Sequence, residues 1–312
     1  MDTPIGLQNE DARDGLPTQG DRRIALVTDS TCDLPEAARV SYRINTVPLH
    51  VSLGGNSYLD RVDLDAAGFY RRFRETGQNA KSSQPSIGEF EKVYSDLLGD
   101  YEAVVSVHIS GKLSGTVQSA LGAARRIDPE RVRIVDSCQV SVGLGLVVQA
   151  AGDAILADYP LDEVVGAAEA AILDTRVFGA LPSLDAAVRG GRLSARTARL
   201  AGVIELKPLV VFDEKGGVHT DGARLGYSRA LRAVARRVAD FSENKPARVA
   251  IVHADGPESA RYVHEQLQGL LGEVEVPVLE AGAVITTHVG LGTVAVAVQR
   301  MAPKTGTPYS PS

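Results

Sequence analysis

The chain has 312 residues, of which 44% are hydrophobic and 23% are charged, a composition typical of a globular protein long enough for about two domains. Its 33 Lys and Arg against 39 Asp and Glu give a net charge of −6, which argues against a dedicated nucleic-acid-binding protein because such proteins need clustered basic residues. Two cysteines, Cys32 and Cys138, are too few for a disulfide framework, so we expect the chain to work in the reducing cytoplasm.

Two α/β domains are predicted between two polar ends. The first residues lack hydrophobic periodicity and an apolar core, so they predict a disordered tail and not a signal peptide. The most apolar stretch, residues 140–157, is interrupted by Gln149 and Asp153 and falls short of a membrane span, so no stable membrane insertion is expected. The expected boundaries are a tail over residues 1–21, an N-terminal α/β domain over 22–158, a C-terminal α/β domain over 159–302 and a tail over 303–312.

Strands and helices alternate through the first half, which predicts a largely parallel sheet. Asp33 and Pro35 predict the start of a helix with the acid as its cap, and Ser86 with Glu89 predict a capping box. In chain order, the other expected elements are a strand at 24–30, a strand at 45–53, a helix at 63–77, an extended segment at 81–85, a helix at 86–100, a strand at 101–110, a helix at 116–127 and a strand at 131–137.

The second half is predicted to be a mixed α/β domain. A long helical region from Gly143 to Val177, broken near Pro160, leads into it. Residues 205–218 carry the turn signal EKGG after an apolar run and predict a hairpin. The remaining expected elements are a basic amphipathic helix at 227–241, a strand at 248–256, a helix at 257–271, a strand at 275–285 and a closing strand at 292–301.

Loops rich in hydroxyl groups and glycine are expected at the ends of four strands. In open α/β sheets, ligands bind outside the carboxyl ends of the strands, so such loops can converge on one crevice. Hydroxyls and backbone N–H groups at helix N-termini are the components of a small-anion site. Each loop alone is also a common helix cap, and only the four together indicate a site. They lie at residues 28–30, 82–86, 114–116 and 286–288.

Other motifs give weaker signals. Arg192 follows two glycines that allow a tight turn, and it could face a carboxylate or a backbone carbonyl, or form a structural pair with a nearby acid. There is no P-loop, and the glycine pairs at 143–145 and 290–292 lack the third glycine of a dinucleotide fingerprint. The six histidines show no metal-ligand spacing. A serine hydrolase that uses Ser114 and His288 stays open as an alternative.

Six motifs, in this order, resemble the DegV family, and the resemblance covers about residues 23–301. It implies a two-domain α/β fold that holds one long-chain fatty acid between and within its domains. It also implies the role of a fatty-acid-binding subunit that presents the carboxyl group to the separate ATP-dependent subunit of a bacterial fatty acid kinase. The motifs are TDSTCDLP from residue 28, KSSQPSIGEF from 81, KLSGTVQSA from 112, VDSCQVSVGLG from 135, GGR from 190 and TTHVGLG from 286.

The resemblance also assigns residues. Ser82 and Ser114 are expected to hydrogen-bond the fatty acid carboxylate, and His288 is expected beside the head group. Arg224 and Arg229, in a cluster with Arg232, Arg236 and Arg237, are the candidates for contact with the kinase subunit. No cofactor, no metal and no catalytic residue are expected. The supporting loops are expected to contribute Asp29, Ser30, Ser83, Gly115, Thr116, Gly191, Arg192 and Thr287.

Three positions and one segment depart from the usual family pattern. Ser82 stands where threonine is usual, Arg61 where glycine is usual, and Leu291 where proline is usual. Residues 223–231 read ARLGYSRAL, where the pattern Arg-Thr-x-x-Lys/Arg is usual. Ser82 keeps the hydroxyl donor and loses only a methyl group. An imidazole beside a carboxylate is stabilised in its charged form, so fatty acid affinity is expected to weaken between about pH 6 and 8, near the ordinary histidine pKa of about 6.5.

The resemblance therefore implies a non-catalytic fatty-acid-binding protein, which we expect to be cytoplasmic. The alternatives from other classes are a hydrolase or acyltransferase that uses Ser114 and His288, and a sugar binder similar to dihydroxyacetone kinase. The last of these rests on fold analogy alone.

Overall fold

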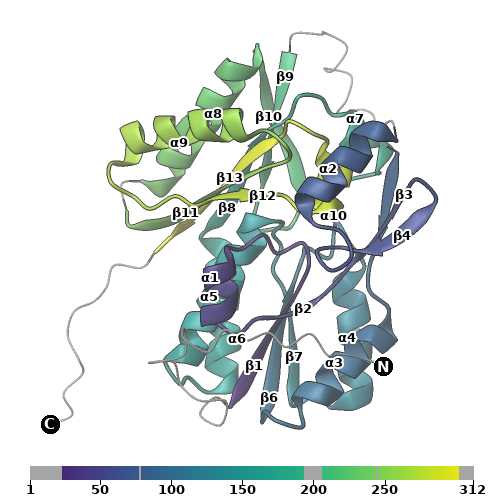
Figure 1. Ribbon diagram of the computed structural model, residues 1–312. Coiled ribbons are helices and arrows are strands. Elements are labelled where there is room, and N and C mark those ends of the chain that lie inside the picture. Colours follow the sequence, from purple (N-terminus) through teal and green to yellow (C-terminus); the bar gives the residue numbers. More distant parts are fainter. Residues whose placement is uncertain (1–22, 77–78, 193–205, 244, 302–312) are drawn as a thin grey trace, which may run out of the picture.

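The computed structural model describes residues 23–76, 79–192, 206–243 and 245–301. Two large sheets lie one above the other, and a small three-stranded sheet lies beside the upper one (Figure 1). The predicted tails, residues 1–21 and 303–312, lie outside the described residues.

The lower sheet is parallel, as predicted, with strand order β2-β1-β6-β7. Leu26 and Val105 pack with α5 and α6, whereas Val27 and Val104 pack with α3 and α4 on the other face. Burial on both faces explains why the central strands are continuous apolar runs. The elements are β1 Ile24–Asp29, α1 Glu36–Ser41, β2 Asn45–Val47, α3 Ile87–Leu97, β6 Ala103–His108, α4 Thr116–Ile127, β7 Val132–Asp136, α5 Val142–Leu156 and α6 Leu161–Leu173.

The upper sheet is mixed, with strand order β10-β9-β8-β13-β11-β12. Only β11 and β12 pair in parallel within it, and β9 with β10 forms the predicted hairpin. Helices α8 and α9 cover one face, and the other face turns toward α5. The elements are β8 Thr175–Ala180, α7 Asp185–Arg189, β9 Leu206–Phe212, β10 Val218–Leu225, α8 Tyr227–Ser242, β11 Ala247–His253, α9 Pro257–Leu271, β12 Val278–Glu280, α10 Ala283–Val289 and β13 Val294–Arg300.

The small sheet joins the first half of the chain to its last helix. Its order is β4-β3-β5, and the stacked rings of Phe69 and Phe73 on α2 belong to the same core as Ala283 and Val284 of α10. This packing brings the end of β5 next to α10. The elements are β3 His50–Leu53, β4 Asn56–Leu59, α2 Ala66–Glu75 and β5 Ala80–Ser83.

Three local predictions are wrong. The segment 45–53 forms two strands in different sheets, because Pro48 has no N–H for a ladder hydrogen bond. Residues 175–177 belong to the central strand β8 and not to a helix, since tertiary pairing overrides their helical spacing. The segment 275–285 holds only the short strand β12, and α10 begins after Gly282, so residues 286–288 lie on a helix and not in a loop after a strand.

Other predictions are confirmed or redirected. Ser86 and Glu89 form the capping box that precedes α3. Asp33 does not cap α1, which begins after Pro35 without a side-chain cap. Its buried carboxylate turns instead toward Arg61, Ser141 and the N–H of Gly282.

The boundary predicted at residues 158/159 does not coincide with the division between the two large sheets. Helix α6, which the prediction placed in the second domain, packs with α5 on the parallel sheet, and the mixed sheet begins only at Thr175. The break at Pro160 is therefore a turn between two packed helices. Conversely, α2 and the small sheet, from the first half of the sequence, pack against α10.

A buried polar cluster holds the start of α10 against the first half of the chain. Asp33 accepts a hydrogen bond from the Gly282 N–H at 3.2 Å, and Asp60 accepts one from the Ala283 N–H at 3.0 Å. Arg61 forms an ion pair with Asp33, and its φ of 63° explains why glycine suits this position. We call Asp33, Asp60 and Arg61 the α10 clamp.

The clamp predicts an unusual pH dependence of stability. Burial, the largest cause, raises the pKa of Asp60 to about 6, above the value of about 3.9 for an unfolded aspartate. Between these values the folded state binds more protons, so the Asp60 contribution to the free energy of unfolding falls as pH rises from about 4 to 6, by at most about 1.4 kcal/mol per pH unit. Above about pH 6 this contribution is constant.

We expect Asp60→Asn to remove this contribution, measured as the difference between variant and wild type in urea unfolding across the pH range. The matched control is Asp100→Asn, at an exposed position outside the clamp. If the difference in unfolding free energy between Asp60→Asn and wild type varies with pH no more than it does for Asp100→Asn, Asp60 does not titrate in this range.

Candidate functional site

A cavity lies between the parallel sheet, the mixed sheet and α10. Its empty space, counted with the solvent in its open mouth, is about 1050 Å³. Most of the side chains that line it are apolar, among them Val177, Val210, Phe212, Val284 and Ile285. Ligand sites of this kind are apolar with a few placed polar groups.

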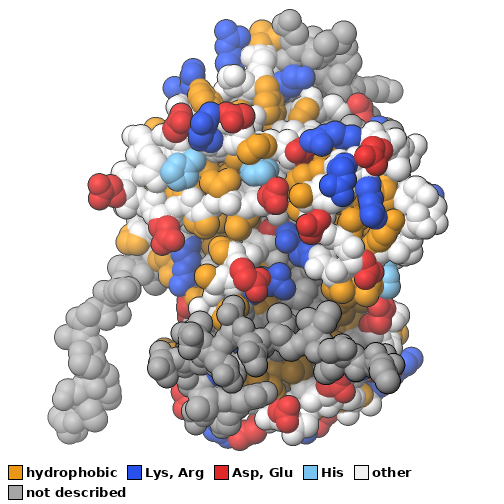
Figure 2. Space-filling model, viewed as in Figure 1, with side chains coloured by type: hydrophobic (Ala, Val, Ile, Leu, Met, Phe, Trp, Pro, Cys, Tyr) orange, Lys and Arg blue, Asp and Glu red, His pale blue; other side chains and the backbone are white. Residues whose placement is uncertain are grey.

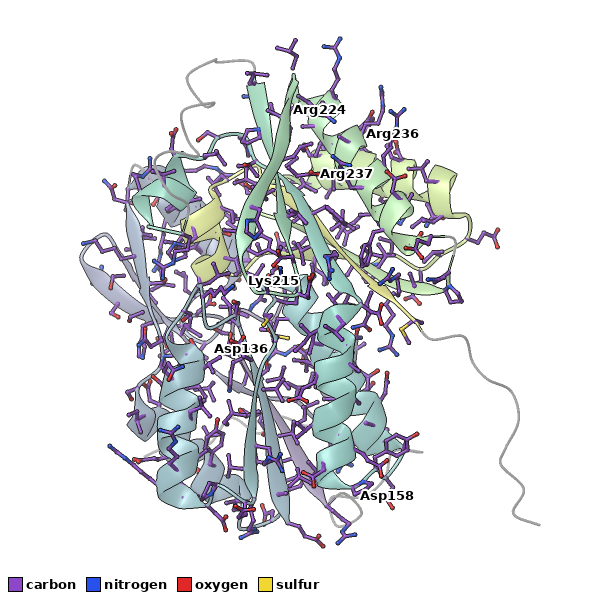
Figure 3. All side chains as sticks on the ribbon, turned by 180° about the vertical axis from the view of Figure 1, so that it is seen from behind. Asp136, Asp158, Lys215, Arg224, Arg236 and Arg237 are labelled. Atoms are coloured by element: carbon purple, nitrogen blue, oxygen red, sulfur yellow. The ribbon has the colours of Figure 1, made fainter. Side chains whose placement is uncertain are left out.

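One wall of the cavity is the β9–β10 hairpin, which reaches across to the parallel sheet. Figure 3 shows its turn, marked by Lys215, close to the end of β7, marked by Asp136. The Ser110 hydroxyl donates to the carbonyl of Gly216 at 2.8 Å, so the turn is fixed to a strand-end loop of the other half. Phe212 and Val218, on either side of this turn, line the cavity.

The polar lining includes Ser82 at the end of β5 and His288 on α10. The Ser82 Oγ and the His288 Nε2 lie 2.7 Å apart, although 206 residues separate them in the sequence. Burial, and to a smaller extent the nearby charge of Arg192, lower the pKa of His288 to about 4. The imidazole is therefore neutral at pH 7.

Gly190 fixes the orientation of this imidazole. A Cβ at position 190 would lie 2.5 Å from the His288 Nδ1, so the ring edge rests against the glycine backbone. Nδ1 is buried and has no hydrogen-bond partner among the described residues. A proton on Nδ1 would point at the Gly190 backbone and find no acceptor, which is unfavourable for a buried donor. We therefore assign the proton to Nε2, which donates to Ser82. The Ser82 hydroxyl proton is then left for a ligand.

Ser114 brings a second hydroxyl from the parallel-sheet half. Its Oγ lies 2.8 Å from the Thr116 Oγ1 and accepts a hydrogen bond from the Thr116 N–H at 3.3 Å, where α4 begins. Gln84 packs on the backbone of Gly115, since a Cβ there would lie 2.5 Å from its side-chain nitrogen. The loops that carry Ser82 and Ser114 therefore contact each other at the cavity.

Arg192 connects the mixed-sheet half to the same place. Its Nε donates to the carbonyl of Leu113 at 3.2 Å, one residue before Ser114, and its side chain lines the cavity. Gly191, with a φ of 73°, provides the left-handed turn that directs the chain there. The structure thus assigns Arg192 a backbone carbonyl as partner and leaves its charge beside the polar lining.

Of the eleven residues predicted for the carboxylate and its supporting loops, five line the cavity. These are Ser82, Ser83, Ser114, Arg192 and His288.

The other six have structural roles near it or away from it. Thr116, Gly115 and Gly191 shape the loops described above. Asp29 accepts from the Ile109 N–H, Ser30 donates to Asp60, and Thr287 donates to the Ala283 carbonyl within α10. Asp29, Ser30 and Thr287 therefore satisfy buried polar groups and do not face the cavity.

Four polar lining residues were not predicted as site residues. Gln84 and Ser141 lie within the motifs KSSQPSIGEF and VDSCQVSVGLG, whereas His253 and Thr293 lie at strand ends without any distinguishing pattern. The apolar lining cannot be told from ordinary core by its sequence, because both consist of the same aliphatic residues.

The arrangement does not favour the hydrolase alternative. The partner of His288 is Ser82 and not Ser114, and no carboxylate contacts Nδ1 among the described residues. A Ser106–His108–Asp29 chain exists, with distances of 2.7 and 3.0 Å, but all three side chains are fully buried. A substrate could not reach that serine.

Within the described ranges, no group of three or more His, Cys, Asp or Glu side chains could hold a metal ion. No helix in that part of the chain has the length and apolar character needed to cross a membrane.

The model of the family described as "Uncharacterised protein, DegV family" matches residues 23–300. The chain belongs to the DegV family. A DegV domain-containing protein of Deinococcus radiodurans is 36% identical to it over 283 residues, which are 88% of this chain and 98% of that protein.

Solved DegV structures share the fold. A DegV family protein of Thermus thermophilus, described by its fatty acid binding, matches with a TM-score of 0.82 and 33% identity over 89% of this chain and all (100%) of that chain. DegV of Bacillus subtilis, described as a fatty acid binding protein, matches with a TM-score of 0.80 and 27% identity over 90% and 100% of the two chains. These findings confirm both the resemblance and the α/β fold.

The charge of Arg192 and the titration of His288 are predicted to be coupled. We expect Arg192→Ala to raise the pKa of His288 from about 4 toward its ordinary value without reaching it, because burial is the larger cause of the shift. Arg192→Lys keeps the charge and should preserve more of the shift. NMR titration of the imidazole measures both, and an unaltered pKa in Arg192→Ala would contradict the assigned cause.

The low pKa also corrects the expected pH range of binding. A carboxylate that raises the pKa of His288 strengthens binding most below the starting value of about 4, and the gain fades as pH rises through the raised value. The dependence on His288 therefore begins near pH 4 and not at pH 6.

Proposed function

We propose that this DegV protein binds one long-chain fatty acid, with its acyl tail in the apolar cavity and its carboxylate at Ser82 and Ser114. The observation that carries the proposal is the pairing of an apolar cavity with two neutral hydroxyl donors, one of them held by His288. The fatty acid binding named for the proteins of Thermus thermophilus and Bacillus subtilis supports it.

The free energies of tail burial and of head-group hydrogen bonding indicate different roles for the two ends of the fatty acid. Burial of roughly fourteen methylenes gains up to ~11 kcal/mol before ordering costs. Each net hydrogen bond adds about 1 kcal/mol, or about 2 kcal/mol when the acceptor is a charged carboxylate. The tail therefore dominates affinity, and the hydroxyls set which end of the ligand faces the polar side.

We further propose that the protein is a non-catalytic, cytoplasmic subunit that presents the carboxyl group to an ATP-dependent fatty acid kinase subunit. Three features support a carrier. No carboxylate supports His288 as a general base in the described structure, Ser114 is hydrogen-bonded to Thr116, and the cavity is lined mostly by apolar side chains. Arg224 and Arg229, at the end of β10 and the start of α8, remain the proposed contact with the kinase.

Ser114→Ala tests the carboxylate contact. We expect it to weaken fatty acid binding by ~1–2 kcal/mol, about 5- to 30-fold, because one donor to a charged acceptor is lost while tail burial stays. A fluorescent fatty acid displacement assay measures the change. Ser228→Ala, at an exposed position on α8, is the matched control and should bind as wild type does.

Organic extraction and mass spectrometry of the protein, purified without detergent, test the carrier itself. A co-purifying free fatty acid agrees with the proposal. A covalent acyl adduct on Ser114 would instead support a hydrolase or acyltransferase that uses this serine. Equal fatty acid affinity of Ser114→Ala and Ser228→Ala, found together with such an adduct, would support the same alternative.

Arg224→Ala and Arg229→Ala test the kinase contact. We expect each variant to slow ATP-dependent phosphorylation of the bound fatty acid by the kinase subunit, because charge complementarity steers association. Fatty acid affinity in the displacement assay should not change. Loss of both activities to the same extent would indicate misfolding and contradict a contact role.

A further inference from the structure

Five arginines line a second concavity, at the end of the molecule opposite Asp158 (Figure 3). Its empty space, counted with the open side, is about 830 Å³. We call it the arginine groove. It lies between the end of β10 and α8, and its lining residues are Arg224, Arg229, Arg232, Ala233, Arg236, Arg237 and Asp240.

Most of this positive charge is not neutralised by the residues that the structure describes. Arg237 is the one groove arginine with a carboxylate partner, Asp221, within the described part of the chain. Among the same residues, Arg224 and Arg229 donate to the carbonyls of Ala223 and Leu225. By contrast, acidic and basic side chains are mixed over the face seen in Figure 2, as suits a chain with a net charge of −6.

The arrangement of these arginines opposes helix stability. Arg229 lies in the first turn of α8, Tyr227–Ser242, where the helix dipole disfavours a cation. Arg229, Arg232 and Arg236 follow at spacings of three and four residues, so like charges share one helix face, which is also unfavourable. Arg232 gains a hydrogen bond to the Tyr262 hydroxyl on α9 at 2.9 Å, whereas Arg229 contacts a carbonyl of the preceding turn. A local cost of this kind is typical of a functional site.

We propose that the arginine groove binds a small molecule that carries two or more phosphate groups. Guanidinium groups pair with phosphate oxygens through two parallel hydrogen bonds. Several converging cations need a multivalent anion, which a diphosphate supplies better than a single carboxylate. A concave site also suits a free ligand better than a flat bilayer.

This site is separate from the fatty acid cavity. Strand β10 runs from Val218, which lines the cavity, to Arg224, which lines the groove, and six residues of strand span about 20 Å. A phosphate ligand therefore does not compete with the fatty acid. It does compete with any partner that contacts Arg224 and Arg229.

Calorimetric titration of the full-length protein with pyrophosphate tests the proposal. We expect saturable one-site binding that weakens as salt is raised. The double variant Arg232→Gln/Arg236→Gln should bind at least about tenfold more weakly. The matched control, Arg125→Gln/Arg261→Gln, removes two exposed arginines on α4 and α9, outside the groove, and should bind as wild type does.

Further arms identify the source of the phosphate and separate this proposal from the previous one. Tighter binding of ATP than of pyrophosphate would identify a nucleotide. Binding to phosphatidylglycerol vesicles or to single-stranded DNA without binding of pyrophosphate would overturn the proposal, as would equal pyrophosphate binding by both double variants. Both double variants should bind the fatty acid in the displacement assay with the affinity of the wild type. A failure of phosphate binding in the arginine groove would therefore not count against the proposed fatty acid binding.

Discussion

Two buried carboxylates at the start of α10 position the rest of the site. Asp33 and Asp60, from the first half of the chain, accept hydrogen bonds from the N–H groups of Gly282 and Ala283. Arg61 balances part of the negative charge of the two carboxylates. Buried charges are costly unless they are paired and hydrogen-bonded, so this geometry is sharply defined. Because α10 also carries His288, a shift of this helix would separate His288 from Ser82 and disrupt the polar part of the cavity.

The site combines neutral donors with one exposed cation. Burial keeps His288 uncharged at pH 7, so the hydroxyls of Ser82 and Ser114 can orient a carboxylate without a buried ion pair. Arg192 supplies positive charge from an exposed position and is itself held by the Leu113 carbonyl. The proposed carboxylate would thus be oriented but not enclosed by charge, as the proposed role of presenting it to a partner requires.

Local patterns in the sequence predicted what local physics decides. The capping box at Ser86, the parallel strands of the first half and the β9–β10 hairpin follow from short-range signals and are present. The central strand β8 and the helix α10 were missed, because distant pairing and the α10 clamp determine them. Ser82, Ser114 and His288 could be named from their motifs. The packing of the His288 ring against Gly190 could not be predicted, because the two residues are almost one hundred positions apart.

The long sequence separation of the clamp has a consequence for synthesis. Asp33 and Gly282 are 249 residues apart, and Ser82 and His288 are 206 apart. A ribosome that adds about 5–20 residues per second therefore completes the parallel sheet many seconds before α10 emerges. During that interval the apolar strand-end side chains around Ile109 and Val140 lack their covering layer, so the growing chain exposes apolar surface until α10 docks.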